Sequence, residues 1–218
     1  MRYCKHCVLP NTKPGITFHS DGVCSACKYV ESKKDIDWKA RQKTLKKICD
    51  EVRGSNGNGY DCVVPVSGGK DSIYQVHMLT KVYKLKVLVV TIMAHLQTPE
   101  GVSNLNSLIT NLGVDSIKVN PRPSTLKKIR KLGLIKIGNP NYAEHYIVFS
   151  AVARVAMFYN APLVVWGEDI GTEFGGNISK GSEKTGSAEG LINNDLFRES
   201  NFDELLSGLV NENELFFW

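Results

Sequence analysis

Cysteine is absent from the sequence beyond Cys62, although the chain of 218 residues contains six cysteines. Long apolar runs are missing too, because no stretch approaches the roughly 20 residues that a membrane-spanning helix requires. The first ten residues, MRYCKHCVLP, lack the apolar core of a signal peptide. The hydrophobic content of 42% excludes disorder as the main state. Together these features predict a cytoplasmic protein with reduced thiols and no membrane partner.

Acidic residues are scarce in the first 167 residues, and basic residues are scarce after them. Residues 1–60 carry 12 Lys and Arg against 6 Asp and Glu, and residues 61–167 carry 12 against 5. Residues 168–218 reverse this balance, with 3 basic and 11 acidic residues. The formal net charge of +5 therefore hides a basic body and an acidic tail. A basic body suits an anionic ligand such as a nucleotide, a nucleic acid or an acidic sugar, although a solvated lysine-rich surface has the same composition.

Two Cys-x-x-Cys pairs occupy the first thirty residues. Cys4 and Cys7 form the first pair, and Cys24 and Cys27 form the second, with sixteen residues between them. This spacing is typical of a zinc ribbon with four thiolate ligands, and the turn-forming residues between the pairs suit short hairpins. Four protein ligands make such a site structural, with no position left for a substrate. Two disulfides or incidental cysteines are the alternatives, and His6 is a further possible ligand.

Residues 31–59 have the pattern of a connector. Apolar residues at 38, 45, 48, 49 and 52 predict an amphipathic helix, and the polar run at 54–59 predicts a flexible break. Cys49 and Cys62 are expected to be plain buried thiols. The predicted domains are a zinc ribbon over 1–30, a helical connector over 31–59 and a nucleotide-binding domain over 60–218.

The motif with the most chemical content follows this break. Residues 61–66 have the pattern of a short buried strand, and apolar residues at 73, 76, 79 and 83 predict a helix. Between them stands Ser67-Gly68-Gly69-Lys70-Asp71-Ser72. Glycines let the backbone pass close to an anion, and the amides at a helix start can bind it. Lys70 adds a positive charge, and Asp71 is expected to hold Mg²⁺ or to cap the helix. The Walker pattern is excluded by its longer spacing, and a glycine turn without a ligand is the alternative.

Strands and helices alternate after this loop. The sequence predicts buried strands at 86–92, 116–119 and 163–166, and helices at 98–113, 125–132 and 146–159. This alternation predicts an α/β fold with a doubly wound parallel sheet. Ligands of such sheets bind beyond the carboxyl ends of the strands. The segments expected to share that rim are 67–72, 91–98 and 167–176.

Two of the rim segments supply further candidate residues. Thr91 and His95 lie near the end of the second strand, where they are placed to contact a nucleotide, although a lone histidine is also common in protein cores. Glu168, Asp169 and Glu173 crowd the end of the fourth strand. Carboxylates there can hold Mg²⁺ or orient an amine or hydroxyl. A surface turn with solvated acids is the alternative.

Four motifs in combination resemble the N-acetyl sugar amidotransferase family. They are MRYCKHCVLPNTKPGITF…GVCSAC, SGGKDS, Ala94-His95-x-x-Thr98-x-x-Gly101-x-x-Asn104-Leu105 and WGED…EFGG. SGGKDS by itself is similar to the pyrophosphatase loop (PP-loop) of N-type ATP pyrophosphatases, which implies a Rossmann-like domain that cleaves ATP between its α- and β-phosphates. The resemblance runs from Met1 to about Gly176. Members are usually longer, so a short or split gene, or a fragment with an incomplete C-terminal part, is expected.

The resemblance implies a reaction. ATP would adenylate the acetamido oxygen of an N-acetyl sugar, and ammonia would replace that oxygen to give an acetamidino sugar and AMP. The product would serve bacterial cell-surface polysaccharide synthesis, such as that of the lipopolysaccharide O-antigen. A separate glutaminase would supply the ammonia, and Mg²⁺ would act with ATP as a cofactor of this chain. The ATP-binding candidates are Ser67, Gly68, Gly69, Lys70, Asp71, Ser72, Thr91 and His95, and the catalytic candidates are Lys70, Asp71, Glu168, Asp169 and Glu173.

Two alternatives of other classes stay open. A PP-loop enzyme that modifies tRNA, such as a thiolase, can also join a zinc ribbon to SGGKDS, and the basic body would bind phosphates. Sulfur transfer commonly uses cysteines near the active site, however, and none follows Cys62, so nucleic acid is not the expected partner. A thiolation fed by sulfide would escape this objection. The second alternative is a non-catalytic nucleotide-binding or partner-docking module, which AMP formation by the purified chain would exclude.

Overall fold

The computed structural model describes residues 1–13, 15–93 and 97–167, which divide into two compact units. The first unit contains residues 1–38 and the second contains residues 39–167. No helix in these described ranges is both long and apolar enough to cross a bilayer. Four candidates from the sequence lie outside the described residues: His95, Glu168, Asp169 and Glu173.

The first unit is built from turns and one short helix. Two isolated antiparallel bridges close its hairpins, and they join Tyr3 to Pro10 and Phe18 to Cys24. Helix α1 (Ser25–Ser32) follows directly, and a turn of 3-10 helix over Lys33–Asp35 ends the unit's regular structure. Its buried cluster consists of Cys4, Cys24 and Ala26. A cluster of three residues is too small to hold a fold in water without a crosslink or a metal.

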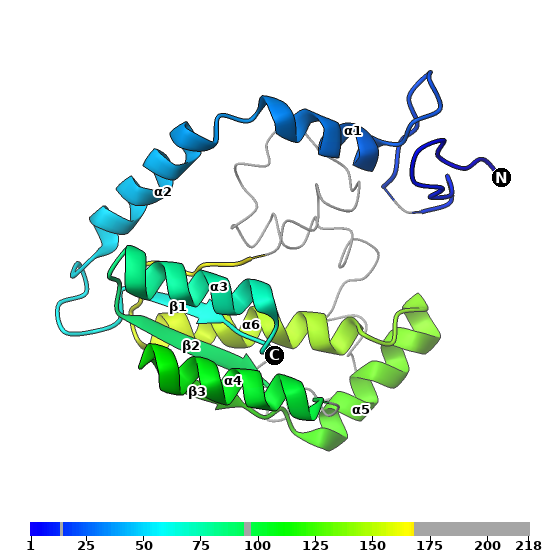
Figure 1. The fold of residues 1–218 in the computed structure, drawn as a ribbon. Helices are drawn as coiled ribbons and strands as arrows, with labels where there is room; N and C mark the ends of the chain where they lie inside the picture. The colour runs from blue at the N-terminus through cyan, green and yellow to red at the C-terminus, as the bar shows by residue number, and fades with distance from the viewer. Residues whose placement is uncertain (14, 94–96, 168–218) are drawn as a thin grey trace. The chain divides into compact units, whose positions relative to one another are not determined.

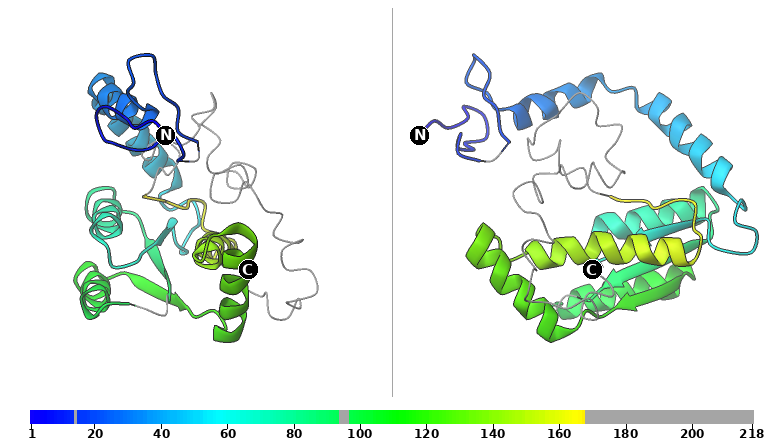
Figure 2. Two further views of the ribbon diagram at one scale, coloured as in Figure 1. Left: turned by 90° about the vertical axis from the view of Figure 1, so that its right-hand side faces the viewer. Right: turned by 180° about the vertical axis from the view of Figure 1, so that it is seen from behind.

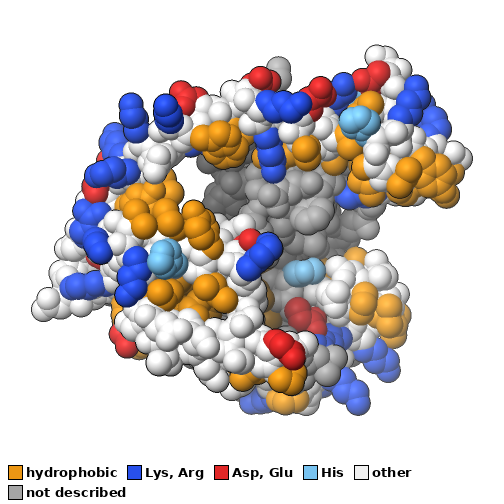
Figure 3. Space-filling model, in the orientation of Figure 1, with side chains coloured by type: hydrophobic (Ala, Val, Ile, Leu, Met, Phe, Trp, Pro, Cys, Tyr) orange, Lys and Arg blue, Asp and Glu red, His pale blue; other side chains and the backbone are white. Residues whose placement is uncertain are grey.

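Helix α2 (Trp38–Val52) confirms the predicted amphipathic helix of the connector. Lysine and arginine side chains gather over it (Figure 3), as its lysine-rich sequence requires. Its buried residue Cys49 belongs to the core of the second unit, together with Cys62 on the first strand. The polar residues of α2 thus face solvent while its C-terminal half anchors it to the α/β unit.

A parallel sheet lies at the centre of the second unit (Figure 1). Its strands are β1 (Cys62–Pro65), β2 (Val87–Ile92) and β3 (Asp115–Val119), hydrogen-bonded in that order. Both pairings are parallel, and the register sets Val64 beside Val89 and Val90 beside Ile117. Strands β1 and β2 are buried on both faces, as their apolar runs predict. The α/β class with a parallel sheet is confirmed.

The predicted fourth strand at 163–166 is wrong in its extent. The segment runs beside β1, where the Val63 N–H donates to the Leu163 carbonyl at 2.9 Å and the Val165 N–H donates to the Val63 carbonyl at 3.0 Å. Only a single parallel bridge, Val63 with Val164, results. The next bond of such a ladder would need an N–H at Pro65, and proline has none. Pro65 in β1 therefore ends the pairing between β1 and this segment.

Helices cover both faces of the sheet (Figure 2). On one face lie α3 (Lys70–His77), its π-helical continuation Met78–Val82, and α4 (Pro99–Leu112). On the other face lie α5 (Pro123–Leu132) and α6 (Tyr142–Phe158). The first face buries alternate strand residues against both of its helices, with a core that includes Cys62, Val64, Val87, Val89, Val76, Leu79, Leu105 and Leu108. This three-layer arrangement is the doubly wound one.

Helix α6 begins four residues before its predicted start at 146. A π-helical turn over Gly133–Ile137 precedes it, and the start of α6 packs back onto this turn. A Cβ atom on Gly133 would lie 2.6 Å from the Asn139 carbonyl oxygen and 2.9 Å from Cβ of Tyr142, closer than real contacts allow. The missing side chain of Gly133 thus lets Tyr142, which is 1% exposed, dock at the start of α6.

Candidate functional site

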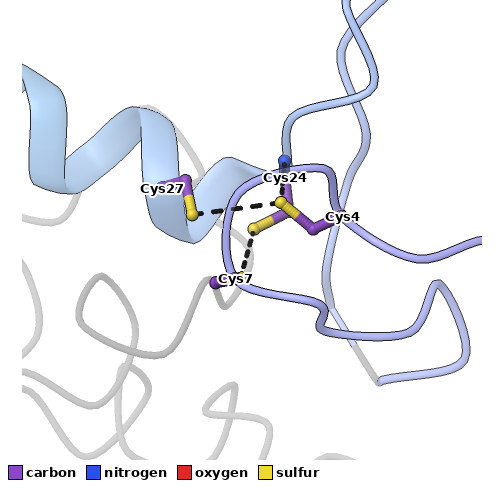
Figure 4. Close-up of side chains that lie close together, drawn as sticks. All are labelled: Cys4, Cys7, Cys24 and Cys27. Carbon is purple, nitrogen blue, oxygen red and sulfur yellow. Dashed lines mark hydrogen bonds between the residues drawn. The ribbon is translucent and has the colours of Figure 1, made fainter.

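Four thiols meet in the first unit (Figure 4). The Sγ atoms of Cys4, Cys7, Cys24 and Cys27 all lie within 4.8 Å of one another. Cys4 and Cys27 are 3.9 Å apart, and Cys7 and Cys24 are 3.5 Å apart. A tetrahedral ion with metal–sulfur bonds of about 2.3 Å places its ligands about 3.8 Å apart. The predicted ligand set therefore fits a single metal ion, and all four residues are free thiols rather than disulfides.

The backbone around these thiols favours a negative charge on one of them. Burial opposes ionisation of Cys4, but backbone hydrogen bonds from Cys7, Cys24 and His6 outweigh it and lower the pKa of this thiol to about 6. Burial and the neighbouring thiols raise the pKa of Cys27 to about 12 and also raise the pKa of Cys24. A cation bound between the sulfurs would offset the cost of charging the crowded group. His6 contributes its backbone N–H, 3.3 Å from Cys4 Sγ.

The other two cysteines are plain buried thiols, as predicted. Cys49 and Cys62 are both fully buried in the core of the α/β unit. Burial raises the pKa of Cys62 to about 12 and raises that of Cys49 as well. A thiol that stays protonated is a poor nucleophile and a poor metal ligand. Neither residue is equipped for sulfur chemistry.

The glycine loop leads from the carboxyl end of β1 into α3. The Val66 N–H donates to the Val90 carbonyl at 2.9 Å, which ties the start of the loop to β2. Gly68 has a φ of +85°, a backbone conformation that side chains disfavour, and Gly69 is the N-cap of α3. Glycine offers no capping side chain, so the first N–H groups of α3 remain available to an anion.

The start of α4 holds the loop in place. A Cβ atom on Gly68 would collide with the carbonyl oxygen of Gly101, so only glycine permits this approach. The Asn104 side-chain amide donates to the Gly68 carbonyl at 3.3 Å. Thr98 caps α4 by accepting from the Gly101 N–H at 3.1 Å, as its sequence predicts. Two helix N-termini thus come together at this loop.

The polar side chains of the loop divide into two groups. Ser67 Oγ accepts from the Gly69 N–H at 3.4 Å, and Ser72 Oγ donates to the Gly69 carbonyl at 3.0 Å, so both hydroxyls brace the loop. Lys70 and Asp71 project into solvent, with side chains 86% and 74% exposed, and Lys70 Nζ lies 2.8 Å from a carboxylate oxygen of Asp71. Asp71 stands in the first turn of α3 instead of capping it, since Gly69 is the N-cap. A free phosphate could compete with this carboxylate for Lys70.

Thr91 is buried in β2 and is not exposed at the rim of the sheet. It shares a sheet face with Val87 and Val89, which belong to the core beneath α3 and α4. Thr91 is 0% exposed, and its hydroxyl has no hydrogen-bond partner in the described part of the chain. It is thus placed beside the loop in the sheet but buried from solvent.

Gly101 and Asn104 are residues of this site to which the sequence assigned no role. Both occur in the run Thr98-x-x-Gly101-x-x-Asn104, where a spacing of three places all three residues along one side of α4. That spacing is the signal that could have identified them. Their contact with Gly68, which is more than thirty residues earlier, is a tertiary feature without a sequence signal of its own.

Comparisons with known proteins give no family assignment for this chain. No family model matches the sequence, and no curated protein matches it. Three similar solved structures have low identity. An NH3-dependent NAD synthetase from Campylobacter jejuni is 16% identical, with a TM-score of 0.44, over 83% of this chain and 90% of that chain. An NMN synthetase from Francisella tularensis is 15% identical, with a TM-score of 0.44, over 80% of each chain. A U34-tRNA thiolase from Methanococcus maripaludis is 14% identical, with a TM-score of 0.42, over 88% of this chain and 61% of that chain.

Proposed function

We propose that this chain is an ATP-using enzyme of the PP-loop type that adenylates the acetamido oxygen of an N-acetyl sugar and replaces it with ammonia. The observation that carries the ATP site is the loop at the carboxyl end of β1, where Gly68 adopts φ +85° and Gly69 leaves the start of α3 uncapped. The acceptor is inferred from the resemblance of the four sequence motifs. A cytoplasmic location is part of the same proposal.

The loop offers the groups that a polyphosphate needs. Backbone N–H groups at the start of α3 point outward, and the positive end of the helix dipole lies there. Lys70 supplies a mobile positive charge that moves from Asp71 to the phosphates when the nucleotide binds. Ser67 and Ser72 keep the loop in the shape that exposes these amides. Mg²⁺ would neutralise part of the phosphate charge, with Asp71 as the described residue placed near it.

The proposed chemistry solves a leaving-group problem. The oxygen of an acetamido group attacks the α-phosphorus of ATP, the bond to the β-phosphate oxygen breaks, and pyrophosphate leaves with the electron pair. Ammonia then adds to the activated carbon, the carbon–oxygen bond breaks, and AMP leaves with the former acetamido oxygen. Charge builds on the phosphates in the first step, where Lys70 and the loop amides can stabilise it. A separate glutaminase would supply the ammonia.

The four-cysteine site is proposed to bind a structural Zn²⁺. Sulfur–sulfur distances of 3.5 and 3.9 Å suit one ion, whereas an iron–sulfur cluster, with several irons between its ligands, holds cysteines farther apart. Four protein ligands close the coordination shell, so the ion would stabilise the unit and take no part in the reaction. Sulfur transfer through a protein thiol is disfavoured because the remaining thiols, Cys49 and Cys62, are buried in the core of the α/β unit. A tRNA thiolation fed directly by sulfide would not need them and stays the second candidate.

The test is release of AMP and pyrophosphate by the purified full chain. The assay supplies ATP, Mg²⁺, ammonium and a panel of N-acetylated sugars, with bulk tRNA as a separate arm. We expect AMP formation that depends on one of the sugars. We also expect a product whose mass differs from that of the sugar by the replacement of one oxygen with NH. Lys70→Ala should lower AMP formation at least a hundredfold. Lys81→Ala, at the opposite end of the same helical segment, is the matched control and should change it less than twofold.

Each arm of this assay has a defined meaning. AMP formation only in the presence of tRNA would contradict the sugar reaction and would indicate that the chain modifies tRNA instead. ATP binding without AMP under any condition would favour the non-catalytic module. Equal loss of AMP formation in both lysine variants would show that Lys70 does not contact the phosphates of ATP in the way proposed.

A further inference from the structure

A groove runs between α3 and α4 on the outer face of the α/β unit. The two helices lie side by side on the same face of the sheet (Figures 1 and 2). The groove has a volume of about 580 Å³, with α3 as one wall and α4 as the other. Its lining contains no acidic residue, and its apolar side chains are Ile73, Tyr74, Leu108 and Leu112.

The protein itself covers this apolar lining only in part. Leu108 is buried, and Ile73 and Leu112 are half-buried against the core of the unit, so these three side chains form the floor of the groove. Tyr74 is 64% exposed beside them. Hydrophobic side chains also gather over α3 in the space-filling view (Figure 3). An exposed aromatic ring next to an apolar floor is typical of a surface that binds another protein segment.

A lysine stands at each end of the groove. Lys70 lines it at the start of α3, and at the far end Lys81 Nζ lies 3.4 Å from the Leu112 carbonyl oxygen. Lys81 comes eleven residues after Lys70, which corresponds to about 16 Å along a helix. Lys70 pairs with Asp71, but both side chains are exposed, and such surface pairs are weak. The groove therefore presents a lysine, an apolar centre and a second lysine in that order.

A segment of the same chain has the complementary order. Residues 199–218 lie outside the described residues, and their sequence contains five Asp and Glu but no Lys or Arg. Acidic residues at 203, 204, 212 and 214 flank apolar residues at 205, 206, 209 and 210. The segment thus places acidic groups on both sides of an apolar centre, which matches the groove in charge and in hydrophobicity. Amphipathic segments commonly bind apolar grooves between helices in this way.

We propose that residues 203–214 bind in the groove between α3 and α4 of the same molecule. Their apolar side chains lie against Tyr74 and the floor of the groove, and their acidic groups lie near Lys70 and Lys81. The inference is independent of the proposed reaction.

The length of the intervening chain favours this occupant over a separate protein. The 35 residues from 168 to 202 can span about 120 Å when extended, whereas a unit the size of residues 39–167 has a radius of gyration of about 14 Å. The segment can therefore reach any face of the unit. A tether of this kind gives an effective concentration on the order of a millimolar, so that even a groove of modest affinity is occupied.

Photochemical crosslinking in the full chain tests this placement. Tyr74→p-benzoylphenylalanine puts a photoreactive group in the groove, and mass spectrometry identifies the peptides that it joins after irradiation. We expect residues 203–214 to be the main crosslinked site. Phe158→p-benzoylphenylalanine is the matched control, because Phe158 is an aromatic residue that is 78% exposed on α6, on the other face of the sheet. It should form this crosslink at least tenfold less.

Substitutions in the segment distinguish binding from chance encounter. Leu205→Asp combined with Leu209→Asp should lower the yield of the Tyr74 crosslink at least tenfold. Ser207→Asp adds an acid without removing an apolar group, so the yield should stay within twofold. Glu212→Gln combined with Glu214→Gln should lower the yield about threefold at low salt and leave it unchanged at 1 M salt.

Three results would overturn the proposal. They are crosslinks from position 74 only to other parts of the chain, an undiminished yield in the double leucine variant, and crosslinks that join two molecules in a mixture of isotope-labelled and unlabelled chains. None of these measurements requires AMP formation. A failure of the proposed reaction would therefore leave this binding site intact, and loss of the crosslink would leave the reaction untouched.

Discussion

The two units of this protein are held together by different means. The first unit has three buried residues and four thiols within 4.8 Å of one another. The second has a core that buries thirteen residues between β1, β2, α3 and α4. Burial of apolar surface stabilises a fold by about 25 cal/mol per Å², so the second unit has its own driving force and the first does not. The difference predicts that the first unit needs a metal ion in order to fold and that the second unit does not.

The largest expected effect is the unfolding of the first unit when one of its four clustered thiols is removed. Cys24→Ser should abolish the stoichiometric metal and unfold residues 1–38, because a structural zinc site contributes about 10–16 kcal/mol. Residues 39–167 should stay folded. Metal analysis and backbone amide spectra measure both outcomes in one sample. Cys49→Ala is the matched control and should keep the metal while lowering the stability of the α/β unit; loss of both units together in Cys24→Ser would contradict the comparison.

The second prediction concerns the loop of the larger unit. Gly68→Ala should weaken binding of ATP more than tenfold, because the new Cβ meets the Gly101 carbonyl oxygen and a φ of +85° costs about 1–2 kcal/mol for alanine. Calorimetric titration with Mg-ATP measures the change. Gly113→Ala, at the end of α4, provides the control, since φ is +66° there too but nothing lies within 4 Å of a new Cβ. Equal losses in the two variants would show that the close approach at Gly68 does not matter.

A smaller effect is expected from the side chain that supports the loop. Asn104→Ala removes the 3.3 Å hydrogen bond to the Gly68 carbonyl, which is worth about 1 kcal/mol. The Kd for ATP should therefore rise about fivefold, and zinc content should not change. Asn106→Ala, two residues along the same helix and exposed, should bind ATP as the wild type does. A wild-type affinity in Asn104→Ala would remove Asn104 from the site.

The smallest effect is a pH dependence in α2. Hydrogen bonds from Lys46 and Arg53 hold the pKa of Asp50 below its ordinary value of 3.8. A lowered carboxyl pKa stabilises the fold above that value and loses the effect as the pH falls through the folded pKa. Asp50→Asn should therefore lower the melting temperature slightly at pH 7 and not at pH 2. Melting curves at both pH values decide this, and a difference that persists at pH 2 would contradict the assigned cause.

Local chemistry explains which elements could be predicted from the sequence. Helix α4 has a Thr98 cap, a proline at its first position and Gly113 in the left-handed conformation at its end, so both boundaries were predictable. The loop was predictable because its glycines and lysine are consecutive in the chain. The cluster of four thiols was predictable from spacing alone, since two Cys-x-x-Cys pairs at this separation are typical of a metal site.

Tertiary contacts explain what could not be predicted. The segment at 163–166 has the apolar pattern of a strand, but Pro65 in its neighbour lacks the N–H that would extend the ladder. The early start of α6 depends on Gly133, which lies in the preceding turn. The ion pair between Arg130 and Glu144 joins residues that are fourteen apart on different helices, so no periodicity predicts it. The role of Asn104 likewise depends on a contact across the sheet edge.

An isotope measurement tests the proposed reaction most directly. The acetamido oxygen of the sugar is labelled with oxygen-18, the full chain is incubated with ATP, Mg²⁺ and ammonium, and the AMP is analysed by mass spectrometry. Adenylation of that oxygen predicts one labelled oxygen in every AMP molecule released with the acetamidino product. Unlabelled AMP, with the label retained in the sugar or released to water, would contradict it.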